Sequence, residues 1–256
     1  MLIPITVIPP AEAPRLRGEG AALTHRGCVR DRNEDSIITD PTGKLWAVAD
    51  GMGGYGYGDV ASDIVMDCLS RISDDAEPIT ALVTELDHAN QTVRARAREL
   101  SVAQMGSTVV AMILSQGRAH IAWVGDSRAY LFRRGNLRLL TRDHSLVQDM
   151  VDQGSLSPED AERHPEANIV TRAIGGDETL EPDSMTVPVF RGDRLMLCSD
   201  GLTRAVYEQE IADALAVAPD PAAACTALMR KALDAGAPDN VSIIVIAMEE
   251  ASGATR

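Results

Sequence analysis

The stretch STVVAMILSQGRAHIAWVGDSRAYLFRRGNLRLLT (107–141) decides how this chain folds. It holds four runs rich in apolar and β-branched residues, and the turns SQGR, GDSR and RRGN separate one run from the next. Short runs joined by glycine-containing turns are typical of β-hairpins. Because strands joined by a hairpin run in opposite directions, the stretch predicts an antiparallel sheet.

The elements on either side extend this prediction to the whole chain. Apolar residues at helical spacing predict helices over about 59–72, 78–100, 208–217 and 221–235. Further strands are predicted at AALTHRG (21–27), DSIITD (35–40), KLWAVAD (44–50), DSMTVPVF (183–190), DRLMLCSD (193–200) and NVSIIVIAM (240–248). This order lacks the regular βαβα alternation of a parallel sheet. We therefore expect an α+β fold in which antiparallel sheets are covered by helices.

Composition and charge narrow the class of protein. Of the 256 residues, 45% are hydrophobic and 24% are charged, as in an ordinary soluble globular domain. The net charge of -14 argues against nucleic acid or an acidic membrane as a partner, since both require a basic surface. The apolar start MLIPITVIPP (1–10) is short, interrupted by proline and lacks a basic leader, unlike a signal peptide or membrane span. We expect a cytoplasmic monomer with an extended lead-in over 1–18, one domain over 19–249 and a tail over 250–256.

The four cysteines give no metal or disulfide signature. Cys28, Cys68, Cys198 and Cys225 are scattered along the chain, and no two of them form a CxxC pair. Three of them fall inside predicted strands or helices, where a cysteine usually acts as a small buried hydrophobe. The spacing therefore predicts neither a zinc site nor a disulfide framework.

Aspartates recur where apolar runs end. Three runs stop at Asp50, Asp126 and Asp200, each beside a glycine, and Asp239 directly precedes the last predicted strand. Each one alone is typical of a turn. Together, at the ends of strands that share a core, they would place several like charges close to one another, which requires a compensating cation. Oxygen ligands without clustered histidine or cysteine favour magnesium or manganese over zinc.

The glycine-rich loop GMGGYGYGD (51–59) follows the first of these aspartates. Such a loop after a strand commonly cradles phosphate, but Asp50 would repel phosphate unless a cation lay between them. The loop has no lysine after its glycines and no clean GxGxxG motif, so a nucleotide-binding site is not supported. A calcium-binding domain is not supported either, because the chain has no 12-residue EF-hand spacing. Upstream, Glu34 and Asp35 add two acids, and Arg30 could clamp a pair of phosphate oxygens.

These motifs occur in the order of one known family. The chain resembles the bacterial PP2C-type (PPM) metal-dependent serine/threonine protein phosphatases over about residues 20–248. The matching stretches are GCVRDRNEDS (27–36), VADGMGG (48–54), MGSTVV (105–110), VGDSRAYLFRRG (124–135), LTRDHSLVQDMVDQG (140–154), HPEANIVTRAIGG (164–176), GDRLMLCSDGL (192–202) and DNVSIIV (239–245). The resemblance implies a four-layer α-β-β-α sandwich of two antiparallel sheets flanked by antiparallel helix pairs.

The resemblance also implies two Mn²⁺ or Mg²⁺ ions in each active site. Asp50 is similar to the aspartate that bridges both ions, and Gly51 to the residue that offers its backbone carbonyl to the first. Asp200 and Asp239 resemble the remaining protein ligands of the second ion. A hydroxide that bridges the ions would attack phosphorus.

Further roles are carried over in the same way. Asp126 matches the aspartate that, with Asp200, holds a weaker third ion in bacterial members. Glu34 and Asp35 resemble acids that hold metal-bound waters, and Arg30 resembles the phosphate clamp. The segment 144–168 corresponds to the flap beside the active site.

The function implied is hydrolysis of phosphoserine and phosphothreonine on bacterial signalling proteins. The partners would be phosphorylated proteins, in particular a serine/threonine kinase that the enzyme opposes. The alternative is a pseudophosphatase of the same fold that binds phosphoproteins with little turnover, and the presence of every metal aspartate and of Arg30 argues against it. The glycine loop is similar to that of phosphatases associated with type VI secretion kinases.

Five positions near the motifs differ from the family or have no assigned role. Met52 stands where eukaryotic members often have a histidine proposed as general acid, and no other residue is assigned that role. Tyr55 and Tyr57 either line the substrate entrance or pack against the core. His144 and His164 flank the flap, where turn or capping roles are more typical than catalysis.

Overall fold

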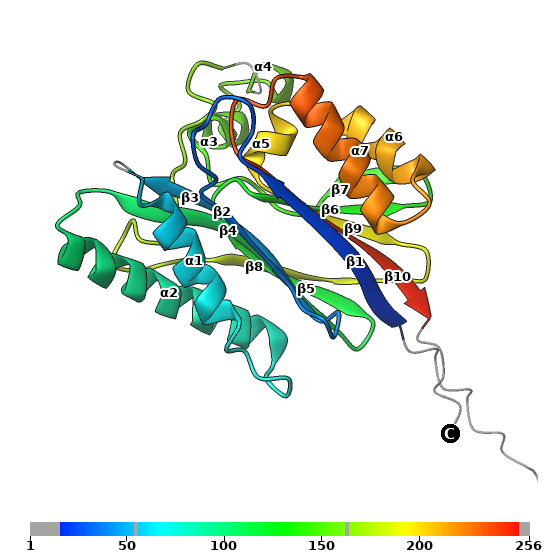
Figure 1. Cartoon of the computed structure of the whole chain (residues 1–256), viewed down its shortest axis with the longest axis horizontal. Coiled ribbons are helices and arrows are strands. Elements are labelled where there is room, and N and C mark those ends of the chain that lie inside the picture. Colours follow the sequence, from blue (N-terminus) through cyan, green and yellow to red (C-terminus); the bar gives the residue numbers. More distant parts are fainter. Residues whose placement is uncertain (1–15, 54–55, 162–163, 251–256) are drawn as a thin grey trace, which may run out of the picture.

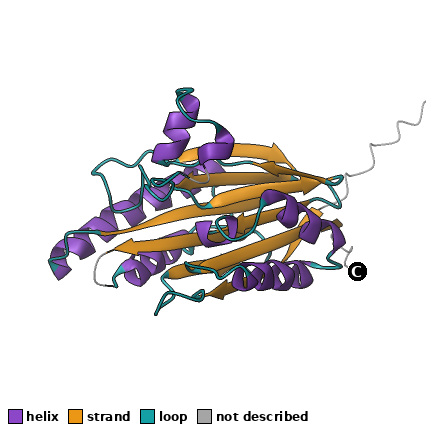
Figure 2. Ribbon diagram, turned by 90° about the horizontal axis from the view of Figure 1, so that it is seen from above, coloured by secondary structure: helices purple, strands orange, loops and turns teal. Residues whose placement is uncertain are grey.

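The computed structural model describes residues 16–53, 56–161 and 164–250. Two five-stranded sheets lie face to face, and every strand pairing is antiparallel (Figures 1 and 2). The first sheet has the order β1 (Leu16–His25), β10 (Val241–Glu250), β9 (Arg194–Cys198), β6 (Arg128–Arg133) and β7 (Asn136–Leu139). The second has the order β2 (Asp35–Thr39), β3 (Leu45–Gly53), β4 (Met105–Ser115), β5 (Arg118–Val124) and β8 (Asp183–Pro188).

Helices cover the outer face of each sheet (Figure 1). Helices α1 (Gly58–Leu69) and α2 (Pro78–Leu100) pack on the second sheet, and α6 (Glu208–Val217) and α7 (Pro221–Asp234) pack on the first. The short helices are α3 (Leu146–Asp152), α4 (Pro158–Ala161) and α5 (Asp200–Thr203). The predicted α+β fold, a four-layer α-β-β-α sandwich, is thus confirmed.

Three apolar layers hold the sandwich together. Two lie between a sheet and its helix pair, and the third lies between the sheets. The inner layer includes Trp46 and Trp123, but most of its side chains are aliphatic, such as Val110, Ile121 and Ile244. Strands β4 and β10 lie inside their sheets and are buried on both faces over most of their length, which explains why they read as continuous apolar runs.

Local signals fix the ends of the long helices. Helix α2 begins after Glu77, whose carboxylate accepts hydrogen bonds from the backbone N–H groups of Ile79 and Thr80, and ends at Ser101 in the left-handed conformation. Helix α7 begins after Asp220, whose carboxylate accepts from the N–H of Ala223, with proline at the next position. No helix within the described residues has the length and apolar character needed to cross a membrane.

The first strand is longer than its sequence predicts. A strand was expected from residue 21, but β1 begins at Leu16. Its first half, LRGEG, has little apolar pattern, so the strand is fixed by its partner β10, which pairs with it from Leu16 opposite Glu250 onward. Gly20 leaves room for the Trp46 ring, which a side chain there would overlap. Contact between distant segments, rather than local pattern, sets this end.

Candidate active site

The strand ends named in the sequence meet at one edge of the sandwich. Asp50 lies on β3 directly opposite Asp35 of β2. Asp126 follows β5, Asp200 follows β9, and Asp239 precedes β10, the antiparallel neighbour of β9. Because neighbouring strands run in opposite directions, the end of one strand and the start of the next share an edge. We call these five side chains the acidic cluster.

Two glycines allow the loops of this edge to touch. A β-carbon on Gly51 would overlap the backbone carbonyl oxygens of Gly58 and Glu34, and one on Gly201 would overlap the carbonyl oxygen of Asn240. Only glycine permits backbone segments to approach this closely. The residues next to Asp50 and Asp200 are therefore glycines because of packing between loops.

Asp35 is a buried carboxylate held by two serines. Its Oδ2 accepts hydrogen bonds from the hydroxyls of Ser199 (2.9 Å) and Ser242 (2.6 Å), which lie on the other sheet's side of the cluster. Burial raises the pKa of Asp35 to about 7, although these hydrogen bonds oppose the rise. Its Oδ1 is buried and has no hydrogen-bond partner in the described part of the chain.

Three further carboxylates, those of Asp50, Asp126 and Asp200, also have raised pKa values and are shifted toward the neutral form. Burial and the negative charges of Asp35 and Asp200 raise the pKa of Asp50 well above its ordinary value. Burial, followed by the charge of Asp200, raises the pKa of Asp126 to about 7. Burial likewise raises the pKa of Asp200, whose Oδ1 has no hydrogen-bond partner among the described residues. Ionising all of these carboxylates together would thus concentrate negative charge in a buried place, which is why their pKa values are raised.

Two arginines offset part of this charge. Arg30 contacts Asp239 at 2.8 Å, and this partner raises the pKa of Arg30. Arg204 forms an ion pair with Asp200, and its guanidinium lies 3.7 Å from both Asp126 and Asp239. Sequence analysis predicted a role for Arg30 but missed Arg204. Its position four residues after Asp200, on the same face of a helical turn, was the available signal.

Asn240 was also missed, and it anchors the loop that carries Arg30. Its amide donates to the carbonyl oxygens of Arg26 (3.0 Å) and Arg32 (2.8 Å), while its Oδ1 accepts from the N–H of Glu34 (2.8 Å). Glu34 in turn accepts a hydrogen bond from the N–H of Gly58 at the start of α1 (3.2 Å). These contacts bring Glu34 and the Arg30 loop to the acidic cluster.

The segment 144–168 starts from a buried histidine beside the cluster. His144 accepts a hydrogen bond from the N–H of Gly125 (3.0 Å), lies 3.3 Å from Asp183, and stacks on Trp123. The hydrogen bond with Gly125 fixes the turn that precedes Asp126, so His144 is a structural residue. His164 accepts from the N–H of Glu166 within a turn.

Of the two tyrosines in the glycine loop, the structure describes Tyr57 alone. Tyr57 is partly buried and packs against the core beneath α1 and α2, which favours the packing alternative over the entrance alternative. Tyr55 lies outside the described residues.

The donor set of the cluster suits a hard divalent cation. Every predicted ligand atom is oxygen, and two buried carboxylate oxygens, on Asp35 and Asp200, have no hydrogen-bond partner among the described residues. A cation would satisfy both the unpaired oxygens and the excess charge. Oxygen-only sites of this kind bind Mg²⁺ or Mn²⁺ rather than zinc.

Comparison with known proteins places these features in context. The sequence profile described as protein phosphatase 2C matches residues 24–235. The serine/threonine protein phosphatase PstP of Mycobacterium tuberculosis is 40% identical over 230 residues, which are 88% of this chain and 44% of PstP. The chain therefore spans less than half the length of that relative.

Solved structures share the fold. The catalytic domain of a PstP in complex with two manganese ions aligns with a TM-score of 0.84 and 35% identity, covering 92% of this chain and 100% of that chain. PppA, a key regulatory component of T6SS in Pseudomonas aeruginosa, aligns with a TM-score of 0.83 and 39% identity, covering 91% of this chain and 98% of that chain.

The raised carboxylate pKa values predict that the metal-free protein loses stability as pH rises. Asp35 and Asp126 have ordinary pKa values of 3.8 and values of about 7 in the folded protein. The folded state therefore holds protons that the unfolded state releases between these limits, and each pKa unit corresponds to about 1.4 kcal/mol. In EDTA, we expect Asp35→Asn to flatten the fall in unfolding free energy between pH 5 and pH 8, as measured by urea denaturation. The exposed control Asp177→Asn should follow the wild type, and a steeper fall in Asp35→Asn would contradict the assignment.

Proposed function

Because this chain belongs to the protein phosphatase 2C family, we propose that it hydrolyses phosphoserine and phosphothreonine on proteins. The observation that carries the proposal is the acidic cluster, with unpaired carboxylate oxygens beside two arginines. Such an arrangement suits cations and a phosphate group together. A pseudophosphatase is less well supported, since none of the predicted ligand residues is replaced in the sequence.

We assign Asp50, Asp200, Asp239 and the backbone carbonyl of Gly51 as ligands of two divalent ions, Mn²⁺ or Mg²⁺. When bound, such ions offset the charge of phosphate and lower the pKa of water. The PstP catalytic domain with two manganese ions supports this number.

Three further acids are assigned to a third ion or to metal-bound water. Asp126 and Asp200 would hold a third, weaker ion, while Glu34 and Asp35 would act through water. Asp35 is suited to that role because its Oδ2 is already held by two serines while its Oδ1 is unpaired.

Arg30 is the residue that we assign to phosphate. Its guanidinium lies at the rim of the cluster with 56% of its side chain exposed, so it can turn from Asp239 toward an incoming ligand. A guanidinium donates two parallel hydrogen bonds to a pair of phosphate oxygens. Arg204 is less exposed and lies among three carboxylates, where it offsets charge rather than receives substrate.

The substrate that we propose is a phosphorylated bacterial regulatory protein, such as a serine/threonine kinase or its target. The likeness to PppA and the glycine loop 51–59 favour a kinase pathway of type VI secretion. A monomeric state, a cytoplasmic location and the domain bounds 19–249 stay predictions of the sequence.

Hydrolysis should depend on divalent metal. We expect the protein to release phosphate from a phosphothreonine peptide in Mn²⁺ and to lose this activity in EDTA, because the acidic cluster alone repels phosphate. Asp239→Asn should lower kcat/KM by at least a hundredfold in Mn²⁺, while Asp177→Asn should leave it unchanged. Phosphopeptide binding without release, under all metal conditions, would instead favour the pseudophosphatase.

Substitution of Arg30 should weaken the enzyme through phosphate binding. Hydrogen bonds to charged groups contribute about 1.5–3 kcal/mol, so we expect Arg30→Ala to lower kcat/KM by roughly 10- to 150-fold. Inorganic phosphate should inhibit the variant less than the wild type. Arg96→Ala removes an exposed arginine of α2 that pairs with Glu99 and serves as control. Unchanged phosphate inhibition in Arg30→Ala would contradict the assignment.

Substitution of Arg204 should strengthen metal binding. The guanidinium competes with cations for three carboxylates, so we expect Arg204→Met to tighten Mn²⁺ binding by roughly tenfold, or about 1.4 kcal/mol, in calorimetric titration. Without metal, the variant should be less stable than the wild type. Arg230→Met, which breaks an exposed ion pair with Asp234 at the same spacing, is the control. Weaker Mn²⁺ binding would mean that Arg204 positions the ligands instead.

A further inference from the structure

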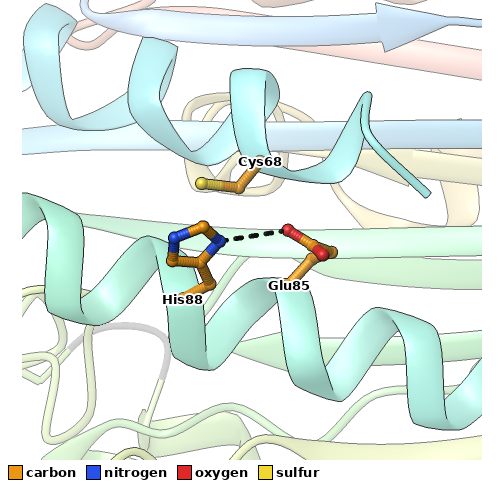
Figure 3. Close-up of side chains that lie close together, drawn as sticks. All are labelled: Cys68, Glu85 and His88. Atoms are coloured by element: carbon orange, nitrogen blue, oxygen red, sulfur yellow. Dashed lines mark ion pairs between the residues drawn. The ribbon is translucent and has the colours of Figure 1, made fainter.

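A second group of metal-ligating side chains lies between α1 and α2, on the outside of the sandwich. Cys68 belongs to the last turn of α1, and Glu85 and His88 are one turn apart on α2. One ligand atom from each residue lies within 4.8 Å of the other two. Figure 3 shows the three side chains pointing toward one another across the gap between the helices.

One buried oxygen atom of this group lacks a hydrogen-bond partner among the described residues. Oε2 of Glu85 is buried and has no hydrogen-bond partner among the described residues. Nδ1 of His88 is 3.5 Å away, which allows an ion pair with a protonated imidazole but is long for a hydrogen bond. A buried carboxylate oxygen without a partner is destabilising, and a cation would satisfy it.

The three ligand types select a particular kind of ion. Thiolate sulfur, imidazole nitrogen and carboxylate oxygen together suit zinc and similar transition metals, whereas Mg²⁺ and Mn²⁺ prefer oxygen alone. The Cys68 thiol is 1% exposed, but half of the His88 side chain is exposed, so an ion can enter past the imidazole and retain a water ligand. This site and the acidic cluster therefore favour different metals.

We propose that Cys68, Glu85 and His88 form a zinc site that joins α1 to α2. The scattered cysteines predicted no such site, because its single sulfur is completed by a Glu-x-x-His pair on another helix. Residues three apart on a helix share a face, as this pair does. The ion would fix the far end of α1, whose first residue, Gly58, contacts Glu34 beside the acidic cluster.

The protonation of the Cys68 thiol affects how this site would bind a metal ion. Burial raises the pKa of Cys68, with Glu85 adding to the rise and Arg71 opposing it. The thiol is therefore protonated without metal at neutral pH, and a metal ion must displace that proton to bind sulfur.

Cobalt absorption tests the proposal on the full chain. Co²⁺ bound by a thiolate gives a charge-transfer band, whereas Co²⁺ at the all-oxygen acidic cluster does not. We expect one equivalent of Co²⁺ to produce the band in metal-free, reduced protein, and Zn²⁺ to remove it. Cys68→Ser should abolish the band, and Cys28→Ser, which alters the one exposed cysteine among the described residues, should retain it.

A variant at the exposed ligand covers the case in which Cys68→Ser does not fold. His88→Ala should weaken Co²⁺ binding at least tenfold and remove most of the rise in Tm that Zn²⁺ gives the wild type. Absence of the band in the wild type, or its loss in Cys28→Ser, would overturn the proposal. So would a band of wild-type affinity in His88→Ala. These outcomes are separate from the phosphatase assay, because no residue of the acidic cluster is altered.

Discussion

Repulsion between carboxylates at one edge of the sandwich is the constraint on which the rest of this structure depends. The same packing that buries three apolar layers brings the ends of β3, β5, β9 and β10 together, and each end carries an aspartate. Arg30 and Arg204 offset part of the charge, yet two buried carboxylate oxygens have no partner among the described residues. Stability of the fold and the ionic state of this edge are therefore linked.

Most of the fold could be predicted because its signals are local. The hairpin turns SQGR and RRGN, helical spacing and the glutamate and aspartate caps each act within a few positions of the chain. The hairpin predicted at GDSR is wrong, because β5 and β6 lie in different sheets and this turn carries the chain from one sheet to the other. The beginning of β1 could not be predicted in this way. LRGEG has little strand pattern, and it becomes a strand through its pairing with β10 and its fit beneath Trp46.

The residues of the candidate site likewise divide into those with a local sequence signal and those defined by contacts between distant segments. Asp50, Asp126 and Asp200 could be found because an apolar run ending in aspartate and glycine recurs three times. Asn240 could not, since its role is to tie a loop near residue 30 to a strand that is distant in sequence. Cys68 and the pair Glu85 and His88 lie on different helices, so the group becomes visible only when α1 packs on α2.

The pairing of β1 with β10 has a consequence for how the protein is made. Among the described strands, β1 leaves the ribosome first and β10 last, yet Leu16 lies opposite Glu250 and β10 is inserted between β1 and β9. Contacts so distant in sequence form slowly. A nascent chain must therefore wait with an unfilled place in its first sheet, and Asp239 cannot be fixed beside the other carboxylates until β10 has been made. The acidic cluster is therefore completed only after all the other described strands have been made.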